Sequence, residues 1–392
     1  MVIKMTSLAL LVLLVFGSIA VAEANKRSSA NAERPVVERV EGRDFPSVFQ
    51  AWSRADNLPN KDRLTVMALH DLVWHAPGGF GLIWDTRPRG LAEAFTPESI
   101  RNSRRIRQKL LKLNPDIILI AEIRYRDAHQ NFLPKEHHWW KRDKEGSLVN
   151  GWREGGFIRL NFADPEFRNH VARRAKAAVQ SGVVDGIMLD WWRDDEHRLA
   201  LIKAVREAIG DKYLIITNTN DRIAPESAPY TNGYFMECTR SNSGADWKRI
   251  VATLKWAEIN LRLPRVNCIE TWYHKSRMDL NLMRATTTLT LTHSNGYCLF
   301  SDPNPLPSAD HRHNWYPFWD KSLGKPISEG TYRNDGTVVR EFQNGTVVYN
   351  PMDNRPIAVV FSDIRRSAAT GKSSRHHELG CPDGDIYLRI KR

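Results

Sequence analysis

The chain has 392 residues, of which 42% are hydrophobic and 26% are charged, and its formal net charge is +12. This composition is typical of a soluble globular protein and does not fit a disordered chain, and the length suits one large domain with a small appendage. Lysine and arginine are spread over several expected helices, which indicates solvated helix faces and no nucleic-acid partner. Attraction to an anionic polysaccharide is the alternative use of this charge.

Residues 1–24 have the pattern of a secretory signal peptide. Lys4 supplies a positive start, residues 8–16 are apolar, and small residues at 20–24 suit cleavage. The apolar stretch is short for a membrane span, and an uncleaved anchor is the alternative. We expect a secreted or periplasmic monomer with no stable membrane contact after cleavage. The polar, aperiodic residues 25–45 are expected to form a linker.

From residue 46 onward, short apolar runs alternate with amphipathic helical segments, as in a parallel α/β fold. The helices are expected at about 97–113, 165–181, 194–209, 246–261 and 279–293. Eight strands with mostly helical connections predict a (β/α)8 TIM barrel over residues 46–324. A doubly wound sheet is the alternative, but Gly78-Gly79-Phe80-Gly81 lacks the spacing of a phosphate-binding turn. The strands are predicted at 64–69, 116–123, 158–162, 183–189, 213–217, 233–236, 265–269 and 296–300.

After residue 324 the pattern changes to short β-like runs separated by turns. These runs lie at 337–341, 345–349, 357–361 and 385–390. They predict a small C-terminal antiparallel β domain over residues 325–392.

The cysteines give no metal-binding pattern. Cys238, Cys268 and Cys298 lie in apolar runs and are expected to be buried thiols, although a Cys268–Cys298 bridge stays open in an exported protein. No spacing of cysteine and histidine indicates zinc. We expect no metal and no cofactor.

Acidic residues stand at the ends of several predicted strands, and the carboxyl ends of barrel strands converge on one mouth. Carboxylates that share a pocket push each other's pKa values apart, so that one stays protonated while another is ionised. Glycoside hydrolysis needs such a pair. The acids are Glu122, Asp190, Glu237 and Glu270, with Asp302 just past a fifth strand and the neutral Asn161 and Asn218 beside them.

Asp190 and Glu237 follow the fourth and sixth strands, so they can face each other across the mouth. We predict that they are the catalytic pair. Glu237 is assigned as the general acid because its apolar neighbours Phe235 and Met236 would raise its pKa, but the roles could be reversed. The substrate is predicted to be a carbohydrate that stacks on Trp191, Trp192, Trp272 and Tyr273, with its hydroxyls bound by Glu122, Asn218, Glu270 and Asp302.

Two other functions remain open. One is a carbohydrate-binding barrel without turnover, and the other is a metal-dependent carbohydrate deacetylase or esterase. His70-Asp71 or His137-His138 could supply metal ligands, but neither fits a zinc-hydrolase motif. The histidines of His311-Arg312-His313 are expected in a surface loop. No GxSxG motif indicates a serine nucleophile.

Two segments resemble a known group of proteins. Asp185-Gly186-Ile187-Met188-Leu189-Asp190, with Gly233-Tyr234-Phe235-Met236-Glu237, is similar to the hypothetical glycosyl hydrolases with a TIM barrel and to their endo-α-1,4-polygalactosaminidase-like relatives. The segments 319–326 and 339–351 are similar to the barrel exit and β tail of the same group. The resemblance spans roughly 60–365 and implies catalytic roles for Asp190 and Glu237.

Overall fold

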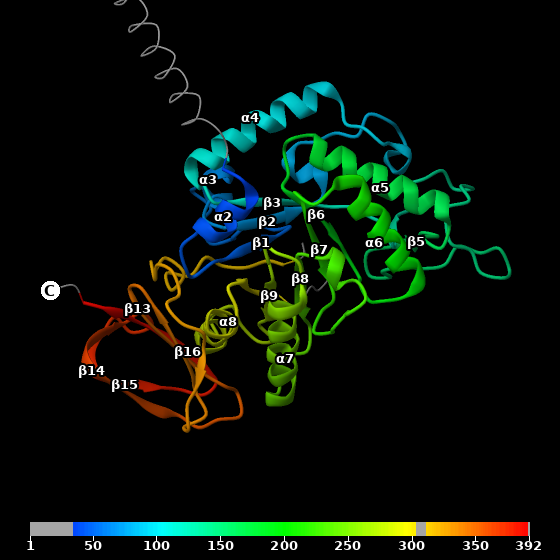
Figure 1. The fold of residues 1–392 in the computed structure, drawn as a ribbon. Coiled ribbons are helices and arrows are strands. Elements are labelled where there is room, and N and C mark those ends of the chain that lie inside the picture. The colour runs from blue at the N-terminus through cyan, green and yellow to red at the C-terminus, as the bar shows by residue number, and fades with distance from the viewer. Residues whose placement is uncertain (1–33, 303–310, 391–392) are drawn as a thin grey trace, which may run out of the picture.

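The computed structural model describes residues 34–302 and 311–390, so the predicted signal peptide lies outside the described residues. Eight parallel strands form one sheet in the order β1-β2-β3-β6-β7-β8-β9-β10 (Figure 1). The sheet closes on itself, because Val48 bridges to Cys298 and the Cys298 amide donates to the Ser47 carbonyl at 2.9 Å. The predicted barrel is therefore confirmed. Its strands are Phe49–Ala51 (β1), Leu72–His75 (β2), Ile118–Glu122 (β3), Gly186–Leu189 (β6), Leu214–Asn218 (β7), Gly233–Cys238 (β8), Cys268–Trp272 (β9) and Tyr297–Ser301 (β10).

Each of the helices α3 to α8 begins after a residue whose side chain accepts from a free backbone amide of the first turn, whereas α2 follows Pro35 and has no such cap. Asp164 accepts from the Glu166 amide, and Ser243 forms a reciprocal capping box with Asp246. These caps fix where each helix follows its strand and so set the spacing of the strand ends. The helices are Val36–Gly42 (α2), Arg63–Met67 (α3), Pro97–Leu113 (α4), Pro165–Gln180 (α5), Glu196–Ile209 (α6), Gly244–Asn260 (α7) and Leu280–His293 (α8).

Two of the eight predicted strands are wrong, although their number is correct. The run 64–69 belongs largely to α3, because the Asp62 carboxylate caps the Leu64 and Thr65 amides and starts a helix there. The run 158–162 contributes to β5 (Phe157–Arg159), which pairs antiparallel with β4 (Asp127–His129) in a separate two-stranded sheet. The very short β1 and β2 take their places. Part of the expected linker, residues 36–42, is helix α2.

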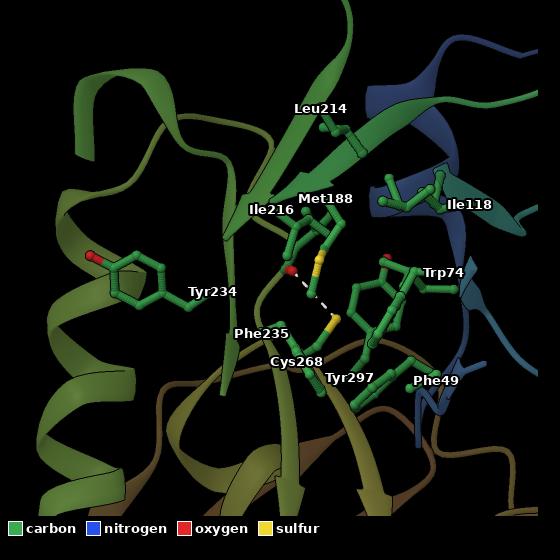
Figure 2. Packing of buried hydrophobic residues seen from close by; sticks show 14 of the residues in the cluster. Phe49, Trp74, Ile118, Met188, Leu214, Ile216, Tyr234, Phe235, Cys268 and Tyr297 are labelled. Atoms are coloured by element: carbon green, nitrogen blue, oxygen red, sulfur yellow. Dashed lines mark hydrogen bonds between the residues drawn. The ribbon is translucent and has the colours of Figure 1, made fainter. Parts of the chain in front are cut away.

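Large side chains from several strands fill the barrel interior (Figure 2). Phe235 makes edge contacts with Phe49 and Trp74, at centroid distances of 5.8 and 5.3 Å. Tyr234 lies on the opposite side of β8 and stacks on Trp256 of α7 at 6.1 Å. This alternation is what a strand with both faces buried requires.

The predicted C-terminal β structure is a six-stranded antiparallel sheet that packs on α8 (Figure 1). One face of the sheet joins the barrel core through Val338, Phe342 and Ile386, so the two units share buried apolar contacts. The sequence predicted four of the strands but missed β11, which is only two residues long, and β15, whose residues are mostly polar. The strands are Thr331–Tyr332 (β11), Val338–Phe342 (β12), Gly345–Asn350 (β13), Ile357–Ser367 (β14), Ser373–Leu379 (β15) and Asp383–Arg389 (β16).

Asp185, at the amino end of β6, holds two helices to the barrel. Its buried carboxylate pairs with Arg39 of α2 and, at 2.6 Å, with Arg107 of α4, and it accepts the Leu119 amide at 2.8 Å. A cavity of about 530 Å³ lies at this end of the barrel, opposite the strand ends that carry the acids. Asp185, Arg39 and Arg107 line this cavity and are partnered with one another, which assigns Asp185 to stability.

We expect Asp185→Asn to lower the free energy of unfolding by about 3–5 kcal/mol, because it leaves two buried guanidinium groups without their counter-charge. Urea unfolding followed by circular dichroism measures this loss. A change below 1 kcal/mol would contradict the assignment.

The four cysteines are free thiols, and Cys238, Cys268 and Cys298 are buried as predicted. Within residues 34–302 and 311–390, no helix has the length and apolar character needed to span a bilayer.

Candidate active site

A pocket of about 340 Å³ opens where the carboxyl ends of the barrel strands meet, and we call it the acidic pocket. It gathers side chains that follow or end β1, β2, β3, β6, β7, β8 and β9. Six of the predicted site residues line it together, which the convergence of strand ends explains. They are Glu122, Asp190, Trp191, Asn218, Glu237 and Trp272, joined by Trp52, Trp74, Arg124, Trp152, Asn220, Arg222, Phe235, Thr239 and His311.

A single amide group joins the two predicted catalytic acids. The Nδ2 of Asn218, at the end of β7, donates to Asp190 Oδ1 at 2.8 Å and to Glu237 Oε2 at 2.9 Å. The two N–H bonds of an amide nitrogen diverge by about 120°, so the two carboxyl oxygens that accept from them lie about 5 Å from each other. Asn218 therefore sets the separation of the acids, in addition to its predicted contact with a sugar hydroxyl.

Burial favours the protonated form of two acids in the pocket. It is the main cause that raises the pKa of Glu237 to about 8, and Glu270 and Asp190 add to the rise while His311 and Asn218 oppose it. Burial likewise raises the pKa of Glu122 to about 7, against the lowering effect of Arg124. Glu237 is thus protonated at neutral pH, as a general acid must be.

Glu270 does not line the acidic pocket, contrary to its predicted contact with substrate. It is fully buried on β9, where its two oxygens lie 2.8 and 3.0 Å from His311 Nδ1 and Ser301 donates a further hydrogen bond. The carboxylate therefore orients the His311 ring. The expected surface loop 311–313 is wrong, since His311 lines the pocket and His313 is buried against His70 at 3.0 Å.

The backbone around the acidic pocket is strained. Among the described residues, those with a left-handed φ that are not glycine are Trp52, Trp191, Asn220 and His311, with φ of 50°, 53°, 54° and 59°. All of them line the pocket. Such conformations cost of order 1–3 kcal/mol each and concentrate at functional sites. Their gathering is independent evidence that the pocket is functional.

The two adjacent indoles have different roles, although both were predicted to stack on sugar. Trp191 is 43% exposed in the acidic pocket, with the Arg126 guanidinium 4.1 Å from its ring centroid. Trp192 is buried, donates from Nε1 to Ser227 Oγ at 3.0 Å, and packs on Tyr125. The prediction is therefore wrong for Trp192, which belongs to the core.

Other aromatic residues give the acidic pocket polar donors. Trp74 and Trp272 line it, and in the described part of the chain their buried Nε1 atoms have no hydrogen-bond partner. A buried donor without a partner costs free energy, which a substrate hydroxyl could recover. Both indoles therefore lie at the wall of the acidic pocket with a buried donor that the described residues leave unsatisfied.

Three predicted residues lie elsewhere. Tyr273 packs on Phe300, and its hydroxyl accepts from Arg277 at 3.0 Å. Asp302 is buried and accepts the Arg312 amide at 3.2 Å. Asn161 follows β5, which is not a barrel strand. None of these residues lines the acidic pocket, because none stands at the position of a barrel strand end whose side chain faces the mouth.

Among residues 34–302 and 311–390, one group of side chains could hold a metal ion. Glu237, Glu270 and His311 each offer a ligand atom, and these atoms lie within 4.8 Å of one another. Two carboxylates and an imidazole suit a divalent cation such as zinc. The predicted alternatives His70-Asp71 and His137-His138 are not part of this group.

Several lining residues were missed by the sequence analysis. Trp52 follows the true first strand, which is only three residues long and was not recognised. Trp74 lies on β2, which was also missed. Trp152 lies in the segment 127–157, between the predicted second and third strands, and the sequence has no signal that brings this segment to the pocket. Arg124 follows Glu122 by two residues and binds it, Nε to Oε1, at 2.8 Å.

Comparison of the sequence with protein-family models and with curated proteins found no match. Solved structures are similar in fold. The maltogenic α-amylase AmyB of Thermotoga neapolitana matches with a TM-score of 0.54 and 12% identity, over 89% of this chain and 100% of that chain. The α-amylase of Geobacillus thermoleovorans, complexed with acarbose, matches with a TM-score of 0.51 and 12% identity, over 88% and 99%.

A third similar structure is the cyclic α-maltosyl-(1→6)-maltose hydrolase of Arthrobacter globiformis. It has a TM-score of 0.52 and 12% identity, over 90% of this chain and 100% of that chain. The matched part of this chain includes both the barrel and the C-terminal sheet. The chain therefore has the fold of these glycoside hydrolases, a (β/α)8 barrel followed by an antiparallel β domain.

Proposed function

We propose that this protein is an exported glycoside hydrolase that cleaves a polysaccharide or oligosaccharide with Asp190 and Glu237. The observation that carries the proposal is the Asn218 amide, which holds an oxygen of each acid at hydrogen-bond distance in one pocket. The implied separation of about 5 Å is that of retaining enzymes, in which the carboxyl groups lie about 5–5.5 Å apart. The strained backbone and the unpartnered indole donors around the acids support it.

The chemistry follows from this geometry in two steps. Asp190 Oδ attacks the anomeric carbon while the glycosidic C–O bond breaks, and Glu237 gives its proton to the leaving oxygen. A water then attacks the anomeric carbon, Glu237 takes its proton, and the bond to Asp190 breaks. The raised pKa of Glu237 suits the first step, and Asn218 keeps both carboxyl groups in position.

Binding without turnover and metal-dependent deacetylation remain the competing functions. The Glu237, Glu270 and His311 group is the specific observation that favours the second. In a metal site Glu237 would be an ionised ligand, whereas its raised pKa, caused mainly by burial, fits a neutral acid beside Asp190.

The test is the release of reducing ends from a panel of neutral and anionic polysaccharides, with and without EDTA. We expect release that EDTA does not change. Acetate release that EDTA abolishes would favour the deacetylase, and tight binding without any product would favour the binding module.

A further inference from the structure

A second cavity, of about 470 Å³, opens beside the acidic pocket, and we call it the arginine pocket. The two cavities are adjacent, because three residues line both of them: Trp52, Glu122 and Arg124. A glycan with one residue in the acidic pocket would place a neighbouring sugar here. Carbohydrate sites combine flat apolar walls with a few polar groups, and Trp84 and Phe157 supply further aromatic surface.

Positive charge distinguishes the arginine pocket. Arg87, Arg89, Arg124 and Arg174 line it, whereas Glu122 is the acid among its lining residues. Arg87 and Arg89 are exposed, and within the described residues no hydrogen bond or ion pair engages either guanidinium. Partial burial, Arg124 and Arg87 all lower the pKa of Arg89, so the guanidinium groups repel one another. An anion between them would relieve this repulsion.

The turn that carries Arg89 is held in place by a buried cation. Arg174, 3% exposed, donates from Nη1 to the carbonyls of Arg89 and Ala92 at 2.7 and 2.6 Å. Its guanidinium lies 3.9 Å from the Trp84 ring centroid, and its buried Nε has no hydrogen-bond partner in the described part of the chain. The pocket therefore keeps a desolvated positive charge at its wall, and the Arg89 backbone is fixed before any ligand binds.

We infer that the arginine pocket binds the anionic group, a carboxylate or a sulfate, of a sugar next to the bond that is cleaved, so that the substrate is an anionic glycan. The planar guanidinium matches both oxyanions with paired N–H donors. The inference rests on the proposed hydrolase function for its substrate role. A polymer of cationic amino sugars, which the polygalactosaminidase resemblance implies, would bring ammonium groups against these arginines.

The experiment measures binding in the full mature chain with Asp190→Asn, so that no turnover is needed. The probes are oligogalacturonate and its methyl ester, which differ in charge, and a sulfated galactan oligosaccharide with its desulfated form. The variant is Arg87→Gln/Arg89→Gln. The matched control is Arg101→Gln/Arg105→Gln, which removes the same charge from exposed positions of α4.

We expect at least one anionic probe to bind ten times or more tightly than its neutral form, because charge-assisted hydrogen bonds to the guanidinium groups are stronger than hydrogen bonds to a neutral group. The Arg87/Arg89 variant should lose that preference and the control should keep it. Whichever anionic probe shows the preference identifies carboxylate or sulfate as the bound group.

Equal binding of charged and neutral probes, or an equal loss in the control variant, overturns the inference and leaves hydrolysis untouched. A charge preference that depends on Arg87 and Arg89, in a protein that hydrolyses no glycan, would instead support the arginine pocket and remove the proposed function.

Discussion

Asp190→Asn is expected to lower kcat for glycan hydrolysis by about a thousandfold or more while leaving substrate affinity within threefold. The loss follows because an amide cannot form the glycosyl bond that the first step requires. The fold should survive, because the Asn side-chain oxygen can still accept from the Asn218 amide and from the Trp191 backbone, as Asp190 Oδ1 does at 2.8 and 2.9 Å. Reducing-end release and calorimetric titration measure the two quantities.

Asp211→Asn is the matched control, since this exposed aspartate pairs with Arg262 and lines the cavity at the opposite end of the barrel from the acidic pocket. It should keep full activity. Equal activity of the Asp190→Asn variant and the control would exclude Asp190 as the nucleophile, and loss of sugar affinity in Asp190→Asn would assign it to binding instead.

The two acids can be told apart with azide, which replaces a missing carboxylate. In Asp190→Ala, azide attacks the anomeric carbon in place of the nucleophile and gives a glycosyl azide of inverted configuration. In Glu237→Ala, the glycosyl–Asp190 intermediate still forms on activated substrates, and azide gives the retained configuration. The opposite pattern would show that the roles are reversed.

The second large effect concerns the proton on Glu237. We expect kcat/KM to fall as the pH rises through about 8, because the general acid then loses its proton. Glu237→Gln should slow hydrolysis of unactivated glycosides by about 10²–10⁴-fold and abolish this alkaline limb. Substrates with a good leaving group need no proton, so their first step should be nearly unaffected. A wild-type rate that is constant between pH 6 and 9 would contradict the assignment.

The same shift predicts a stability signature. The pKa of Glu237 in the folded protein is raised from its ordinary value of 4.5 to about 8, so the folded state holds this proton more tightly than the unfolded chain. Stability is therefore lost as the pH rises from about 4.5 to 8. Glu237→Gln removes this cost, and its melting temperature should rise relative to wild type across that window. A difference that does not vary with pH would show that the buried carboxyl carries no raised pKa.

The sequence predicted the barrel because eight alternating units are a strong pattern that tolerates local errors. The apolar run 64–69 reads equally well as a strand or a helix, and the Asp62 cap decides for the helix. The true first strand, Phe49–Ala51, is too short to show any periodicity. The ends of β6, β7 and β8 were located correctly, so the acids on them were found.

The parts of the site that the sequence could not predict depend on single backbone angles and on distant segments. Trp191 and Trp192 are adjacent indoles, and the left-handed φ of 53° at Trp191 decides which one faces the pocket. His311 returns to the barrel mouth ten residues past β10 and is oriented by Glu270, a tertiary contact with no local signal. The arginine pocket likewise joins the turn at Arg87 and Arg89 to Arg124 and Arg174, which lie far along the chain.

The most direct test of the account is the anomeric configuration of the first product, followed by proton NMR during hydrolysis of a substrate identified in the polysaccharide panel. The account predicts that the newly formed hemiacetal appears with the configuration of the cleaved bond and mutarotates afterwards, because Asn218 holds Asp190 and Glu237 at the short separation of a double-displacement pair. First appearance of the opposite anomer would contradict it, since a single displacement requires a water between acids that lie about 6.5–9.5 Å apart.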